Sequence, residues 1–160
     1  MKNYQNKTKI VKVSKIIRNI LFAGLVFWAI VGIAGLLAAV LVLIGHTKTH
    51  AIGSIFETGG SFLAIPFVFI VNLYFFKFFD RLKNGHLFDS QTTRYLEAAG
   101  KYLILLGIFQ MLFAITAAAI FHPEHVTFSS GGIFSGLMTI FTAWLFREGQ
   151  ELQEEQELTI

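Results

Sequence analysis

The stretch ILFAGLVFWAIVGIAGLLAAVLVLIG, residues 20–45, decides the fold class of this chain. Its 26 residues carry no charge, and 16 of them are Leu, Ile, Val or Phe. A helix crosses the bilayer core with about 20 apolar residues, and these side chains together favour insertion by about 5–10 kcal/mol. The apolar region of a cleaved signal peptide has only about 7–15 residues. We therefore predict that residues 20–45 form an uncleaved first membrane span.

Three further apolar stretches follow, at residues 62–79, 102–121 and 131–146. The last is the shortest, and a buried helix of the soluble type is its alternative. The composition agrees with a membrane protein, because 54% of the 160 residues are hydrophobic and only 14% are charged, against about 25% charged in soluble domains. We predict an all-α fold, a single integral membrane four-helix bundle spanning residues 1–160.

The basic residues predict the orientation of the bundle. Six precede the first span, five lie between Lys77 and Lys101, and Arg147 follows the fourth span. The 46–61 loop contains only Lys48, and the 122–130 loop contains none. Because Lys and Arg accumulate on the cytoplasmic side of short loops, both termini are expected in the cytoplasm.

Three segments make up the predicted cytoplasmic face. Residues 1–19 form a basic arm that can lie against anionic lipid headgroups, or whose lysines only set the topology. The loop around 79–88 is aromatic and basic, with Asn84 and Gly85 as a natural helix stop and Asp89 or Ser90 as the cap of the next helix. Residues 147–160 continue the fourth helix as an acidic tail that can dock on the arm and loop, or on a partner, or remain solvated.

We take eight residues of this loop and tail as a candidate interaction site. They are Phe79, Arg81, Gly85, Phe88, Arg147, Leu152, Glu155 and Leu158.

The sequence predicts neither an enzyme nor a cofactor. It has no Cys, which excludes thiolate nucleophiles, iron–sulfur clusters and Cys-bound zinc, and it has no GxSxG motif, no HExxH motif and no intramembrane aspartate pair. Histidine pairs lie in the predicted outward loops at metal-ligand spacing. We predict no metal site, and name these as the only candidates: His46, His50, His122 and His125.

Small and polar residues within the spans leave two questions open. Gly132 and Gly136 form a GxxxG pair that can pack helices of one chain or of a homo-oligomer. Asn72 and Gln110 are read as interhelical hydrogen-bonding groups, but they are also the basis of an alternative function, a small oligomeric transporter or channel subunit. The interiors of the first, third and fourth spans contain no Asp, Glu, Lys, Arg or His, which argues against a proton-coupled carrier.

The loop and tail also resemble a known family, catalogued as domain of unknown function 2975. The resemblance covers nearly the whole length, and its specificity lies in the aromatic loop with Gly85 before Phe88, and in the tail from Phe146 to Ile160. It implies a bacterial, multi-pass plasma-membrane protein that is often encoded beside a small helix-turn-helix regulator. We expect a non-enzymatic interaction or regulatory protein that binds a cytoplasmic protein, such as that regulator, through its loop and tail, and does not itself bind nucleic acid.

Overall fold

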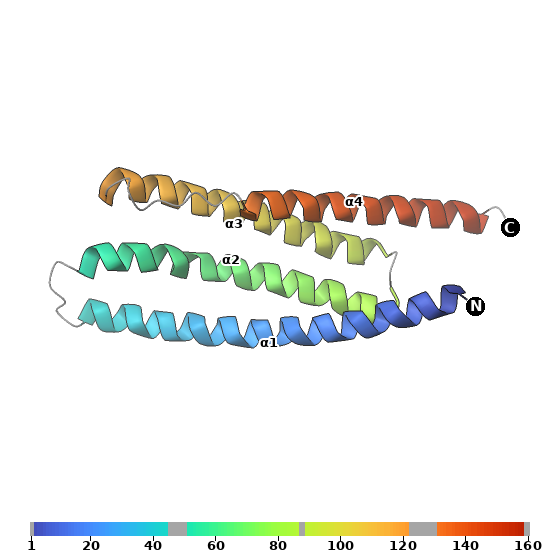
Figure 1. The fold of residues 1–160 in the computed structure, drawn as a ribbon, viewed down its shortest axis with the longest axis horizontal. Coiled ribbons are helices and arrows are strands. Elements are labelled where there is room, and N and C mark those ends of the chain that lie inside the picture. Colours follow the sequence, from blue (N-terminus) through green and yellow to red (C-terminus); the bar gives the residue numbers. More distant parts are fainter. Residues whose placement is uncertain (1, 45–50, 87–88, 122–130, 159–160) are drawn as a thin grey trace.

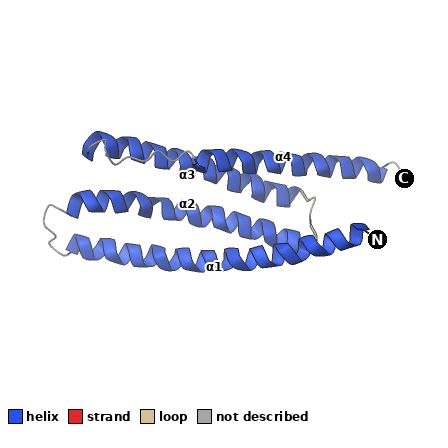
Figure 2. Cartoon of the chain, in the orientation of Figure 1, coloured by secondary structure: helices blue, strands red, loops and turns tan. Residues whose placement is uncertain are grey.

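In the computed structural model the chain folds into four long helices, and the residues described are 2–44, 51–86, 89–121 and 131–158. The helices are α1 (Lys2–Ile44), α2 (Ala51–Lys83), α3 (Ser90–Phe121) and α4 (Gly131–Leu158). All regular structure in these ranges is helical (Figure 2), which confirms the all-α class. The four helices run alternately up and down, so both termini lie at the same end of the molecule (Figure 1). We call this the terminal end.

The helices extend beyond the predicted spans. The basic arm is not a separate element, because α1 runs without a break from Lys2 to Ile44, about 65 Å at 1.5 Å per residue. Pro66 lies within α2 without ending it. The predicted extension of the last helix is also found: α4 continues to Leu158, through Gly149, although glycine is a weak helix former.

Each helix packs on its neighbour in the sequence: α1 on α2, α2 on α3, and α3 on α4. Among the described residues, no Cα atom of α1 lies within 8 Å of α3 or α4. The array is therefore open, with α1 and α4 as its two edges, rather than closed by a contact between the first and last helix. Within the described part of the chain, no Cα atom of the acidic tail lies within 8 Å of the basic arm that we considered as its docking site.

Glycines allow α3 and α4 to pack with their backbones in contact. A Cβ atom built on Gly136 would lie 2.7 Å from the carbonyl oxygen of Gly100, and one on Gly107 would lie 2.6 Å from the amide nitrogen of Ile133. Only a residue without a side chain fits at such a distance. The GxxxG pair of α4 thus packs within the chain, which answers one of the two questions left open by the sequence.

Few apolar side chains are buried, and many large ones face outward. Exposed apolar residues cover α1, the second half of α3 and the first half of α4. The chain exposes 11557 Å², whereas a soluble globular protein of 17.9 kDa exposes about 8,000 Å². By length and hydropathy, two helical segments of the described chain can cross a membrane, Thr8–Leu37 and Ser90–Thr116.

Candidate functional site

The polar and charged side chains gather at the terminal end, where α2 turns into α3. Helix α2 ends in a Schellman motif: the Gly85 amide donates to the carbonyl of Leu82 at 3.0 Å, and the His86 amide to that of Arg81 at 3.2 Å. Gly85 has φ = +85°, a conformation that glycine adopts without steric cost. The helix stop predicted at Asn84-Gly85 is confirmed.

Asp89 begins the next helix. Its Oδ1 accepts a hydrogen bond from the Gln91 amide at 3.3 Å, and its carbonyl accepts the Thr93 amide at 3.2 Å, so Asp89 is the N-cap of α3. Arg81, at the end of α2, forms an ion pair with the other carboxylate oxygen. The hydrogen bond from Gln91 and the neighbouring Arg81 guanidinium hold the pKa of Asp89 below its ordinary value. The two helix ends are therefore tied together by one carboxylate.

The buried hydroxyl group of Thr92 stabilises the turn. Thr92 is fully buried, and its Oγ1 donates to the carbonyl of His86 at 3.0 Å. The interaction joins the first turn of α3 to the last residue of the Schellman motif. Sequence reasoning missed it, because a threonine in a helix gives no signal of a partner six positions earlier.

An apolar cluster supports the turn. Its buried members are Phe78 and Leu82 of α2, Leu96 of α3 and Ala143 of α4. The Phe78 ring packs edge-on against Phe79 at 5.1 Å and against Phe146 at 6.0 Å between centroids. Phe79 of the candidate site is thus a partly buried packing residue at the edge of this cluster.

Ion pairs connect the helices at this level. The Arg18 Nη1 atom of α1 lies 3.2 Å from the Asp80 Oδ1 atom of α2. On α3, Glu97 pairs with Lys101 one turn later at 2.7 Å, as the i,i+4 spacing predicts. Its second oxygen lies 3.4 Å from Nη2 of Arg147 on α4.

A lysine and three tyrosine rings form further contacts between α2 and α3. Lys77 Nζ lies 5.9 Å from the ring centroid of Tyr74 and 5.7 Å from that of Tyr95. Tyr74 also stacks on Tyr102 at 5.4 Å. The aromatic rings attract the ammonium group, although Lys77 as a whole is exposed. The sequence showed a basic residue at the end of a span, but not this arrangement.

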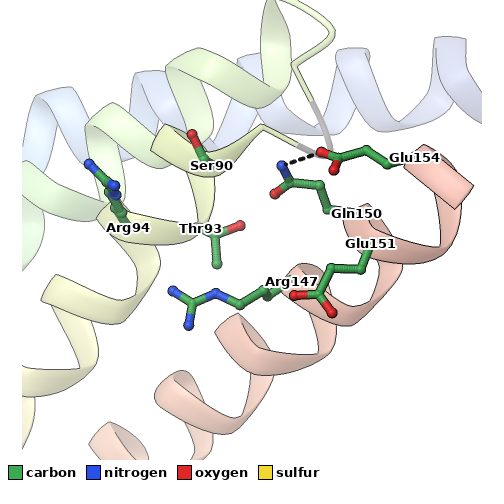
Figure 3. Close-up of a pocket in the computed structure, with 7 residues that line it drawn as sticks. All are labelled: Ser90, Thr93, Arg94, Arg147, Gln150, Glu151 and Glu154. Atoms are coloured by element: carbon green, nitrogen blue, oxygen red, sulfur yellow. Dashed lines mark hydrogen bonds between the residues drawn. The ribbon is translucent and has the colours of Figure 1, made fainter.

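Between the start of α3 and the tail lies a groove of about 280 Å³, which we call the α3–α4 groove. Figure 3 shows its lining: one wall is formed by Ser90, Thr93 and Arg94, and the other by Arg147, Gln150, Glu151 and Glu154. In the tail wall, Gln150 Nε2 donates to Glu154 Oε1 at 3.0 Å. The groove thus presents two guanidinium groups, two carboxylates and two hydroxyls. Such a site can bind polar and charged groups of both signs, but it has no apolar pocket for a small hydrophobic ligand.

The structure brings only part of the predicted interaction site together. Arg81 and Gly85 form the turn, and Arg147 lines the groove. Leu152 and Glu155 are exposed on α4 and do not line the groove. Leu158 is the last residue of α4, and Phe88 lies outside the described residues. The groove residues Gln150, Glu151 and Glu154 were missed, although their spacing from Arg147 by three, four and seven positions marks one face of a helix.

The metal hypothesis stays untested. All four candidate histidines (His46, His50, His122 and His125) lie outside the described residues. Within the described ranges, no group of three or more His, Asp or Glu side chains is placed to hold a metal ion.

Comparisons with known proteins place the chain in a family. No curated protein and no solved structure matches it. A family model matches residues 57–160, from within the first part of α2 to the end of the tail. This range contains the turn, the α3–α4 packing and both walls of the groove. The chain therefore belongs to the family described as "Protein of unknown function (DUF2975)".

Proposed function

We propose that this chain is a multi-pass protein of the bacterial plasma membrane. The proposed spans are residues 20–45, 62–79, 102–121 and 131–146, with both termini cytoplasmic. Exposed apolar faces on α1, α3 and α4 support this placement, because lipid covers such faces and water does not. The ion pairs of Arg18 and Arg147 lie just beyond the spans, where charged side chains can reach the aqueous interface.

In this placement the terminal end is the cytoplasmic face, and its proposed role is non-enzymatic: it binds another protein and so regulates it. The α3–α4 groove is the observation that carries this proposal. It is charged on both walls and lies in the family-matched part of the chain. A protein segment with both acidic and basic side chains is complementary to it. The helix-turn-helix regulator implied by the family resemblance is the first partner to test.

The turn between α2 and α3 positions one wall of the groove. Asp89 and Gly85 fix where α3 begins, and the first turn of α3 supplies Ser90, Thr93 and Arg94 to the groove. The tail supplies the opposite wall. A change in the position of the tail relative to α3 would therefore open or close the groove, which gives the protein a means of controlling partner binding.

The test is a mild cross-linking pull-down from native membranes, with the captured proteins identified by mass spectrometry. The intact chain should capture a specific cytoplasmic protein. Truncation after Phe146 removes the groove wall and should abolish the capture, and Arg94→Ala should weaken it while the protein still inserts. Lys15→Ala, a loss of one exposed charge on α1 away from the groove, is the matched control. Equal capture by the intact and truncated chains would refute the groove as the binding site.

An alternative function, a small transporter or channel subunit, is favoured by one observation. Asn72 lies within α2 facing α1, where a Cβ atom on Gly24 would be 3.0 Å from Nδ2 of Asn72. Its Oδ1 atom is buried and has no hydrogen-bond partner among the described residues, and such a group at membrane depth is costly unless it has a function. Gln110 is exposed on α3. This alternative predicts solute or ion flux in liposomes that Asn72→Leu abolishes, and absence of flux from the purified protein would exclude it.

A further inference from the structure

The two edge helices of the open array have uncovered faces. Within the described residues, α1 packs only on α2, and no Cα atom of α1 comes within 8 Å of α4. Figure 1 shows α1 and α4 on opposite margins of the fold, with their arm and tail at the same end. Each edge therefore has room for one more helix.

The uncovered face of α1 carries a regular stripe. Its positions are separated by alternating steps of four and three residues, and all are exposed: Lys9, Val13, Ile16, Ile20, Ala23 and Phe27. This is the spacing of a helix that packs along its length against another helix. The stripe runs from the arm into the first span, and Lys12 flanks it.

The uncovered face of α4 carries a stripe with the same spacing. Its exposed positions are Met138, Phe141, Leu145, Glu148, Leu152 and Glu155. They lie on the side of α4 away from the α3–α4 groove, whose tail wall is formed by other residues. The α4 stripe is apolar within the span and acidic in the tail, whereas the α1 stripe is apolar within the span and basic in the arm.

The two stripes lie at corresponding heights. Three contacts relate the levels of the helices: Phe22 to Phe76 with ring centroids 6.1 Å apart, Lys77 to the Tyr95 ring at 5.7 Å, and a Cβ atom on Gly136 to the Gly100 carbonyl oxygen at 2.7 Å. Counted along the antiparallel helices from these contacts, Phe22 is level with Phe141 to within about one turn. Ile16 and Leu145 lie about 9 Å and about 6 Å further toward the terminal end, so an antiparallel α1–α4 pair would bring them together, with Lys12 and Glu148 within one turn of each other.

The opposite charges of the arm and the tail indicate what covers the two edge helices. The arm carries six Lys and Arg residues, and the tail carries five Glu and one Arg, yet α1 and α4 are not neighbours in one chain. Lipid can cover the apolar parts of both stripes, but an anionic membrane surface repels the acidic part of α4. The surface that complements it best is the basic arm of another molecule of the same chain.

We propose that two copies of this chain form a dimer in which α1 of each packs antiparallel on α4 of the other. Both interfaces are equivalent under a two-fold axis along the membrane normal, as is usual for homodimers. The eight helices then form a closed ring in which every helix has two neighbours. This dimer rests on the proposed membrane placement but not on the proposed cytoplasmic partner, because the groove is on the other side of α4.

The absence of cysteine from the chain makes cross-linking decisive. Two differently tagged chains, one with Ile16→Cys and one with Leu145→Cys, are co-expressed and oxidised in native membranes. The expected product is a disulfide-linked dimer carrying both tags. Asn19→Cys with Thr142→Cys is the matched control, since both positions are exposed at similar height but off the stripes, and it should cross-link on the order of tenfold less.

Charge reversal provides a second, independent measurement. Lys12→Glu should lower the yield of the Ile16–Leu145 cross-link by about two- to fivefold, the range for one exposed ion pair, and adding Glu148→Lys to the same chain should restore it. Equal cross-linking of the stripe and control pairs, or no mixed dimer, would overturn the proposal. A chain with both Ile16→Cys and Leu145→Cys that cross-links only within itself would also overturn it, by showing that α1 and α4 meet in one molecule.

Discussion

Replacing Gly136 by alanine tests whether backbone contact holds α3 against α4. The new Cβ atom would lie 2.6 Å from Ile104 Cγ1, 2.7 Å from the Gly100 carbonyl oxygen and 2.8 Å from the Ile104 amide nitrogen. Two of these neighbours are backbone atoms that cannot rotate away, so the helices must separate. Overpacking of this kind costs about 1–3 kcal/mol.

Gly32→Ala is the matched control. Its Cβ atom would meet only Ile65 Cγ2, at 3.6 Å, which is an ordinary van der Waals contact. Both substitutions gain the preference of a helix for alanine over glycine, up to about 1 kcal/mol, and this gain cancels when the variants are compared. The difference between them therefore isolates the steric term, and Gly136→Ala should be less stable than Gly32→Ala by about 1–3 kcal/mol.

The assay is unfolding in mild detergent micelles by titration with sodium dodecyl sulfate, followed by the fluorescence of Trp28 and Trp144. The expected result is a lower midpoint for Gly136→Ala and a midpoint for Gly32→Ala at or above that of the parent chain. Equal midpoints for the two variants would refute the reasoning, because they would show that α3 and α4 are not packed closely enough for one methyl group to matter.

Three further predictions concern the terminal end and use the same unfolding assay. Gly85→Ala should destabilise the fold by about 1–2 kcal/mol, because a residue with a Cβ atom is strained in the left-handed backbone conformation. Gly85→Asn should destabilise it by less, and an equal loss of stability in the two variants would contradict this explanation. The pKa of Asp89 is lowered from its ordinary value of 3.8. The Asp89 carboxylate should therefore stabilise the fold fully above pH 3.8, and this contribution should be lost as the pH falls through the lowered pKa. Asp89→Asn should remove this pH dependence, and an unchanged dependence of stability on acid pH in that variant would contradict the prediction. Glu97→Gln, which weakens the pairs with Lys101 and Arg147, should cost less than about 1 kcal/mol because these side chains are partly exposed, and a larger loss would reveal a more buried network.

Local signals predicted the elements at the terminal end well. The stop at Gly85 and the cap at Asp89, one of the two candidates, depend on residues close together in the sequence, and both are confirmed. The α3–α4 groove could not be predicted in the same way. Its walls are more than fifty positions apart, and they face one another only because Gly100, Gly107 and the glycines of α4 set the depth and register of the packing.

The predicted interaction residues of the tail do not share one face, and the sequence could not show this. Arg147 was expected to act with Leu152 and Glu155, as part of one tail. On a helix, however, positions that differ by five or eight residues need not share a face, and the structure places Arg147 in the groove and Leu152 outside it. Which face of the tail is covered depends on where α3 lies, and no pattern within the tail contains that information.

By itself the sequence determined that this protein is all-helical, where its turn and cap lie, and that its charges gather at the ends of its helices. Hydrophobic composition and helix-end chemistry suffice for this, because both act over a few residues. The tertiary structure alone decided that the glycines of α4 pack within the chain, that one face of the tail forms a groove with the start of α3, and that α1 and α4 remain as open edges. Those outcomes depend on which helix approaches which, and steric fit between distant glycine backbones governs that choice.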